Sequence, residues 1–172
     1  MFTKANFSIF VIWLFHISGI IGIHMGYTEF FLSKSWFTLC LSAFLLLINS
    51  QIQRQPWLLL LVGVIGFASE VVGTSTGAVF GDYAYGENLG YKLWNVPLVI
   101  AVNWFMLGIL AFVVASKITS NKIATIVLSA LIMVLIDLII EPVAPKFDYW
   151  EFAGGMPGMH NYIGWFIVAL PV

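Results

Sequence analysis

Long apolar stretches alternate with short polar ones along the chain, and this pattern predicts membrane-spanning helices. A helix needs about 20 mostly apolar residues to cross the hydrocarbon core of a bilayer. The polar connections read YTEFFLSKS, QIQRQP, GDYAYGENLGYKLWN, KITSNK and EPVAPKFDYWEFAGGMPGMH. Between them we expect six spans, at about 5–26, 35–50, 57–76, 95–116, 122–141 and 160–172.

The last expected span differs from the others in length. It holds about 13 residues, or roughly 20 Å of helix, which cannot cross a core of about 30 Å. Either the chain is cut there or the native protein continues, and a seventh helix would then be missing at the C-terminus. No internal repeat is visible. We expect an all-α fold, a polytopic membrane helix bundle in which residues 1–172 form a single integral membrane domain.

Composition supports the membrane class. The chain is 61% hydrophobic and 9% charged, whereas an ordinary soluble domain is about 25% charged. With a net charge of −1 and no basic run, nucleic acid is a poor candidate partner, so membrane lipid is the expected surrounding. A small excess of Lys and Arg in alternate connections favours a cytoplasmic N-terminus in a cell (inner) membrane. The oligomeric state stays open.

Two acids interrupt the predicted spans, Glu70 and Asp137, and Glu141 follows at a membrane rim. An Asp at a helix centre costs about 2.5–3.5 kcal/mol on insertion scales. Such residues face a protein interior or a water cavity and are functional candidates, although an interhelical hydrogen bond would also explain them. Asp137 and Glu141 are four residues apart and share a helix face, and the same spacing groups Glu70 with Thr74.

Acids and aromatic residues together suggest a chemistry. A carboxyl in apolar surroundings stays protonated near neutral pH and can donate its proton to a weak base. Aromatic rings can then stabilise the cation that forms, although aromatic residues at that depth also form the ordinary interfacial belt. Protonation of an isoprenoid alkene, leading to hydration or cyclisation, fits this set. The candidate catalytic residues are Glu70, Asp137 and Glu141, and the candidate substrate-binding residues are Thr74, Tyr83, Tyr85, Trp94, Trp104, Trp150, His160 and Asn161.

Other chemistries find little support in the sequence. Only three histidines are present, too few for a membrane di-iron oxygenase, and His16 and His24 lie eight apart on one helix, where packing explains them. His160, beside Asn161, is expected at a polar cavity mouth. No Gly-rich dinucleotide motif appears. The single cysteine, Cys40, allows no internal disulfide. We expect no metal site and no cofactor.

Two segments resemble the carotenoid biosynthesis membrane proteins of the carotenoid 1,2-hydratase and bisanhydrobacterioruberin hydratase type. They are ASEVVGTSTGAVFGDYAYGENLGYKLWNVPLVIAVNW, residues 68–104, and DLIIEPVAPKFDYWEF with GMPGMHNYIGW, within 137–165. The resemblance implies cofactor-free addition of water to the terminal double bond of an acyclic carotenoid end group, giving a tertiary alcohol. The choice of acids rests on their position and chemistry, not on the resemblance.

The residues themselves leave three functions open. A carotenoid hydratase and a lycopene-type cyclase begin with the same protonation, and exclusion of water separates them. A lipid or small-molecule transporter could use the acids as a proton relay, but such proteins often show repeats and more spans. For the enzyme we expect Glu70 and Asp137 to meet across a cavity that opens toward connections 77–94 and 141–160. Glu70 would donate the proton and Asp137 would hold the water, with Tyr83, Trp104 and Trp150 around the cation.

Overall fold

Apolar helices build most of the protein. The computed structural model describes residues 3–50 and 55–172, so most of the QIQRQP connection lies outside the described residues. Within them the α-helices are α1 (Lys4–His24), α2 (Thr28–Leu32), α3 (Ser35–Asn49), α4 (Pro56–Thr76), α5 (Val99–Ile118), α6 (Lys122–Ile140) and α7 (Met159–Ala169). The short strands are β1 (Tyr83–Tyr85), β2 (Lys92–Leu93), β3 (Val96–Pro97) and β4 (Trp150–Phe152).

The expected class, an all-α membrane helix bundle, is confirmed. Helices α1, α4, α5 and α6 are each long and apolar enough to cross a membrane. Two expected spans form shorter helices: α3 has 15 residues and α7 has 11, which at 1.5 Å per residue give about 22 Å and about 16 Å. The span expected from residue 95 begins only at Val99, because residues 92–97 form the small β2–β3 hairpin.

The helix ends follow the local sequence. Thr3 caps α1 by accepting a hydrogen bond from the Asn6 amide (3.2 Å), and Asn121 caps α6 by accepting one from Ala124 (3.0 Å). Gly77 ends α4 with φ of +68°, a left-handed conformation that suits glycine. Pro142 follows Glu141, the C-cap of α6, so a longer helix is disfavoured there.

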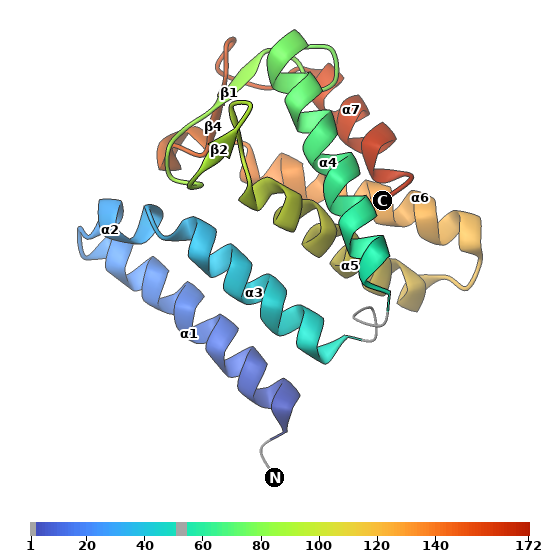
Figure 1. Cartoon of the computed structure of the whole chain (residues 1–172), viewed down its shortest axis with the longest axis horizontal. Helices are drawn as coiled ribbons and strands as arrows, with labels where there is room; N and C mark the ends of the chain where they lie inside the picture. Colours follow the sequence, from blue (N-terminus) through green and yellow to red (C-terminus); the bar gives the residue numbers. More distant parts are fainter. Residues whose placement is uncertain (1–2, 51–54) are drawn as a thin grey trace.

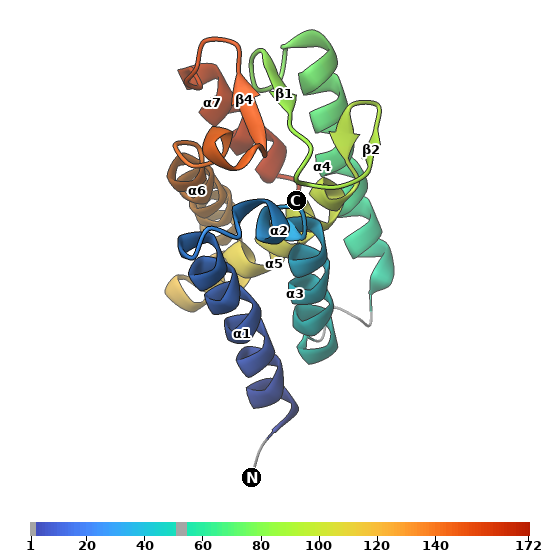
Figure 2. The ribbon, with the colours of Figure 1, turned by 90° about the vertical axis from the view of Figure 1, so that its left-hand side faces the viewer.

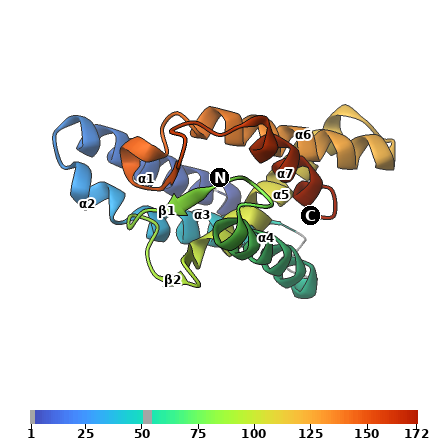
Figure 3. The same cartoon turned by 90° about the horizontal axis from the view of Figure 1, so that it is seen from above.

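Helix α5 lies at the centre of the bundle. It packs against α3, α4 and α6. Figure 1 and Figure 2 show α1 and α3 running antiparallel on one side of α5, with α4, α6 and α7 on the other. Seen from above, α7 lies between α4 and α6, both of which it contacts (Figure 3). The most buried apolar side chains, among them Trp104, Ala111, Ala130 and Met133, lie within this α5-centred group.

Two connections that are far apart in sequence pair at one end of the bundle. Strand β1, in connection 77–98, runs antiparallel to β4, in connection 141–158, with Tyr83 opposite Phe152 and Tyr85 opposite Trp150 (Figure 1). A further hydrogen bond joins the Gly86 amide to the carbonyl of Tyr149 (2.9 Å). The sequence pattern did not predict this ribbon, which fixes the end of the bundle where the acids lie.

Candidate active site

Glycines on α4 make room for the groups that reach Glu70. Gly66, Glu70 and Gly73 are spaced four and three residues apart, so they share one face, and all three are buried. Any side chain at position 66 would overlap the ring of Trp104. A Cβ at position 73 would lie 2.8 Å from Phe80 and 3.0 Å from the Tyr83 hydroxyl. The glycines around Glu70 therefore admit aromatic side chains to its carboxyl group.

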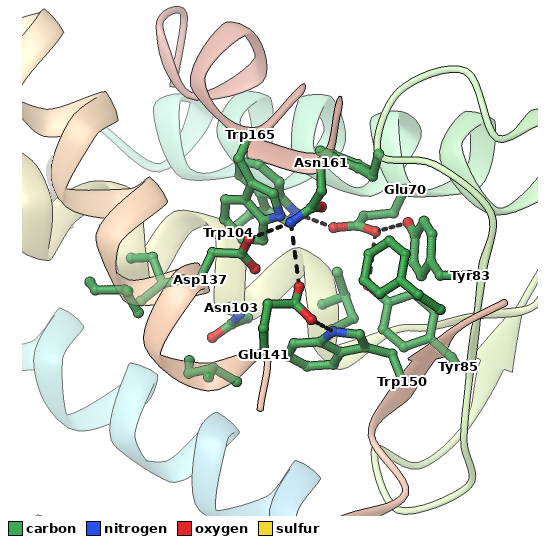
Figure 4. A pocket seen from close by; sticks show the side chains of 16 residues that line it. Glu70, Tyr83, Tyr85, Asn103, Trp104, Asp137, Glu141, Trp150, Asn161 and Trp165 are labelled. Carbon is green, nitrogen blue, oxygen red and sulfur yellow. Dashed lines mark hydrogen bonds between the residues drawn. The ribbon is translucent and has the colours of Figure 1, made fainter. Parts of the chain in front are cut away.

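Three hydrogen-bond donors converge on the Glu70 carboxyl group. The hydroxyls of Tyr83 and Tyr85 both donate to Oε2, the latter at 2.8 Å, and the Trp104 Nε1 donates to Oε1 at 3.0 Å (Figure 4). Side chains two residues apart in a strand point to the same side. Strand β1 therefore aims both tyrosines at Glu70 and leaves Ala84 pointing away.

The two tyrosines are held as neutral donors. Burial, and after it the charge of Glu70, raises the pKa of the Tyr83 and Tyr85 hydroxyls above the usual phenol range. Neither hydroxyl ionises under physiological conditions, so each keeps a proton to donate to Glu70.

A second acidic group faces the first across the site. Asp137 and Glu141 lie one turn apart at the end of α6, and Asn161 of α7 donates to both, at 2.7 Å to Asp137 Oδ2 and 3.4 Å to Glu141 Oε1 (Figure 4). The indole nitrogen of Trp150 donates to Glu141 Oε2 at 3.2 Å. Glu141 lies just beyond the apolar span, and burial raises the pKa of its carboxyl group.

The two acidic groups line one small cavity of about 40 Å³. A cavity needs roughly 10–15 Å³ to hold a water molecule, so there is room for about one to three waters. Its apolar wall includes Phe80 and the stacked indoles of Trp104 and Trp165, whose centroids lie 4.4 Å apart. None of the 16 described lining residues is Lys, Arg or His.

Most of the candidate residues meet at this cavity, and three do not. The ones that line it are Glu70, Tyr83, Tyr85, Trp104, Asp137, Glu141, Trp150 and Asn161. The hydroxyl of Thr74 instead donates to the Glu70 carbonyl of its own helix (2.9 Å), the i−4 hydrogen bond that helical threonines commonly form. Trp94 is 69% exposed on the outside of the bundle, and His160 bonds the carbonyl of Ala78 (2.7 Å). These three do not line the cavity, and their part in substrate binding stays a prediction.

The candidates chosen from the sequence omit the polar lining residue Asn103 and the aromatic lining residues Phe80 and Phe152. Asn103 of α5 and Trp165 of α7 both line the cavity (Figure 4). A signal for Asn103 was present, because an amide inside a span of apolar residues is unusual and marks an interior or functional face. Trp165 belongs to the aromatic residues that the sequence places near the same membrane face, where the interfacial belt is the ordinary explanation.

The acids are arranged for hydrogen bonding among themselves and their donors. Across residues 3–50 and 55–172, no three His, Cys, Asp or Glu side chains are grouped so that they could hold a metal ion. Each oxygen described above already accepts from an indole, a phenol or an amide. The arrangement suits proton transfer and the binding of a small polar molecule such as water.

Fold and site together define a membrane-embedded helical protein with a water-sized cavity lined by acids and aromatic rings. The model of the carotenoid biosynthesis protein family matches residues 30–172. The chain belongs to this family, and the resemblance seen in the sequence is confirmed.

A curated relative is the bisanhydrobacterioruberin hydratase of Haloarcula japonica. It is 30% identical over 125 residues, which cover 67% of this chain and 42% of the relative. The chain therefore spans less than half of the relative's length. No solved structure is significantly similar to this chain.

Proposed function

We propose that the chain is a carotenoid hydratase, which adds water to the terminal double bond of an acyclic carotenoid end group without a cofactor. The relative that bears a hydratase name supports this reaction class. The observation that carries the proposal is the water-sized cavity with three carboxyl groups on its walls. Hydration needs a proton donor, a water molecule and a proton acceptor at one place, and the cavity offers all three.

The cavity must store at least one proton. Glu70, Asp137 and Glu141 are 3%, 3% and 6% exposed, and none of the described lining residues is a cation that balances them. Neighbouring carboxylates repel each other, so a close pair holds one proton between its members. Asp137 and Glu141, linked by one Asn161 amide group, form such a pair.

The hydrogen bonds support a division of labour that is the reverse of the one expected from the apolar surroundings of Glu70. Trp104 can only donate, and both tyrosines donate to the other oxygen, so Glu70 receives three hydrogen bonds. Hydrogen bonds to the charged form favour it. We assign the ionised carboxylate to Glu70 and the stored proton to the Asp137–Glu141 pair.

In the proposed reaction the pair protonates the less substituted carbon of the terminal alkene. The tertiary carbon then carries the positive charge, which the Glu70 carboxylate and the nearby rings of Trp104 and Trp150 stabilise. A cavity water forms the new C–O bond, and its surplus proton passes to Glu70. Return of that proton to the pair through water restores the starting state, so the net change is one alkene plus one water to one tertiary alcohol.

A polar cavity favours hydration over cyclisation. Cyclisation requires that an internal double bond, and not water, reaches the cation. The space between the acids has polar groups on several sides and room for water, which are the conditions under which a buried site is hydrated. Lycopene-type cyclisation would require that water is excluded from this space.

Pigment analysis tests the proposal. Expressed in bacteria that make lycopene, the wild-type chain should yield pigment whose mass is increased by one or two waters. Asp137→Asn combined with Glu141→Gln should abolish both hydration and deuterium uptake from D₂O, because no acid of the pair is left to protonate the alkene. Glu70→Gln should lose hydration but still return alkene that carries deuterium, since a cation without a proton acceptor for water reverts by losing a proton. General acid–base groups typically contribute about 10²–10⁴-fold.

Glu87→Gln is the matched control. Glu87 is an 86% exposed acid that pairs with Lys92 at 2.8 Å outside the cavity, and exposed pairs contribute about 0–1 kcal/mol. At equal protein levels this variant should match the wild type. Cyclised pigment of unchanged mass would show that the chain is a cyclase and not a hydratase. Unaltered lycopene from cells with the wild-type chain would refute both assignments.

A further inference from the structure

The cavity between the acids is too small for the substrate that the proposed function requires. Its volume of about 40 Å³ accommodates one to three waters, whereas a carotenoid end group carries several carbon atoms and a long chain behind them. The end group must therefore arrive through a neighbouring space that touches the acids.

Such a space adjoins the cavity. A groove of about 810 Å³ lies between the α1–α3 hairpin and the α5, α6 and 147–150 segments. This volume falls within the range of about 300–1,000 Å³ typical of small-molecule sites. The groove and the acid cavity share four lining residues: Ile100, Asn103, Ile140 and Trp150. At these residues the two spaces meet.

We propose that this groove holds the hydrocarbon chain of the substrate and presents its end group to the acids past Ile100, Asn103, Ile140 and Trp150. The assignment rests on the proposed function and names the binding site for the long part of the substrate. Most of its walls are aliphatic or aromatic, with Leu14, Phe15 and Ile20 from α1 and Phe37 and Leu39 from α3. A long apolar polyene is the chemistry that such walls bind.

Asn103 lies where the acid cavity and the groove meet. Among the described residues its side chain has no hydrogen-bond partner, although it sits within the apolar helix α5 and is only partly exposed. An unpaired amide in a membrane helix is costly unless a polar molecule satisfies it. Asn103 lines both spaces, on the Asp137 and Glu141 side of the cavity (Figure 4). We assign to it the positioning of the attacking water.

A second apolar groove provides the comparison. It lies between α3, α4 and α5, has a volume of about 800 Å³ and includes Trp94 and Val64 among its walls. Among the residues that the structure describes, it shares no lining residue with the acid cavity. The two grooves are therefore similar in size and apolarity, and they differ in that only the substrate groove shares described lining residues with the acid cavity. Filling each groove in turn separates their roles.

Gly19 allows the substrate groove to be filled with little risk to the fold. It lies in α1 and lines the groove, and a Cβ built there meets no heavy atom within 4 Å. Replacing a glycine inside a helix also favours the helix, by about 1 kcal/mol for alanine. The series Gly19→Ala, Gly19→Leu and Gly19→Phe should therefore fold while it occupies more and more of the groove. Val64→Phe, at a 55% exposed position, is the matched variant of the other groove.

Each variant is purified from lycopene-producing cells, and two quantities are measured: the visible absorbance of bound pigment per protein and the hydrated fraction of the pigment extract. Bound pigment and hydration should both fall along the Gly19 series, by about tenfold or more for Gly19→Phe. Val64→Phe should stay within about twofold of the wild type. Circular dichroism and elution volume establish that each variant is folded.

The two measurements separate the groove from the reaction. If the wild type binds pigment that Gly19→Phe loses, yet forms no hydrated product, the groove assignment stands and the hydratase proposal fails. If hydration occurs but Gly19→Phe retains wild-type binding and turnover, the groove assignment is overturned. Equal losses in Val64→Phe and Gly19→Phe would also overturn it, because the groove without contact to the acids would then matter as much.

Discussion

Removal of one hydroxyl from the Glu70 site tests which acid is ionised. Tyr85→Phe deletes the hydrogen bond of 2.8 Å to Glu70 Oε2 and leaves the donors Tyr83 and Trp104 in place. The ring of Tyr85 contacts Tyr83 and Trp150, with centroids 5.7 Å and 6.3 Å away, and these contacts remain in the variant. The change is therefore confined to one donor.

The expected size of the effect follows from the charge of the acceptor. A hydrogen bond to a charged group contributes about 1.5–3 kcal/mol, and one between neutral groups about 0.5–1.5 kcal/mol. If Glu70 acts as a carboxylate, the difference between these two contributions, about 1–1.5 kcal/mol, means that loss of the Tyr85 hydroxyl reduces its ionised population by about tenfold at a given acidic pH. The acid limb of the pH–activity profile should then move upward by about one pH unit.

Hydration of lycopene by purified enzyme in liposomes, measured from pH 5 to pH 9, provides the assay. For Tyr85→Phe we expect a strong loss of rate at pH 6 that is largely restored at pH 8. A matched change, Tyr91→Phe, alters a tyrosine that is 78% exposed and should leave the profile unchanged. If the acid limb of Tyr85→Phe stays in place and only its alkaline limb moves, Glu70 is the proton donor and our division of labour is wrong.

Two further predictions concern stability. Gly66→Ala should lower the midpoint of thermal unfolding in detergent, because the added Cβ would overlap Trp104 and overpacking costs about 1–3 kcal/mol. The control Gly19→Ala adds a Cβ that meets no heavy atom within 4 Å and should not lower the midpoint. Equal midpoints for the two variants would contradict the close approach of α4 and Trp104. Burial raises the pKa of Glu141, so its stabilising effect is complete at low pH and is lost as the pH rises through that value. Between pH 4 and pH 8 the midpoint of thermal unfolding should thus fall less for Glu141→Gln than for the wild type or Glu87→Gln. If the midpoints of all three fall equally with pH, the pKa of Glu141 is not raised.

The helices could be predicted because their signal is local. Apolar runs bounded by polar residues correctly placed α1, α3, α4, α6 and the core of α5 to within a few residues. The β1–β4 ribbon could not, because its pairing joins residues that are about 67 apart and each strand has only three residues. A stretch such as DYAY has no period long enough to identify a strand, so its geometry depends on a partner that the local sequence does not reveal.

The sequence predicted the parts of the site that follow from the free-energy cost of a carboxyl group in a membrane span, and not the parts that follow from packing between helices. A carboxyl group inside a span is expensive, and that cost identified Glu70 and Asp137 without any structure. Helical spacing places Thr74 one turn from Glu70, where its hydroxyl bonds the Glu70 carbonyl and does not line the cavity. In the structure Gly66 and Gly73 occupy the helix face of Glu70, since aromatic rings from other segments require the space. Packing between helices decides which aromatic ring lies against these glycines, and the spacing of residues along one helix does not predict it.

The separation of a cavity lined by polar groups from a mostly apolar groove suggests how one framework could serve either of two outcomes. Both hydration and cyclisation begin with a proton from the acids, and the fate of the cation depends on what lies next to it. Here Asn103, Glu141 and Asn161 bring polar atoms to the cavity, while the adjoining groove is mostly apolar. A chain with the same helices but apolar residues at positions 103 and 161 would offer water fewer hydrogen-bond partners. The side chains at the junction, rather than the acids, would then decide whether the cation is captured by water or by its own chain.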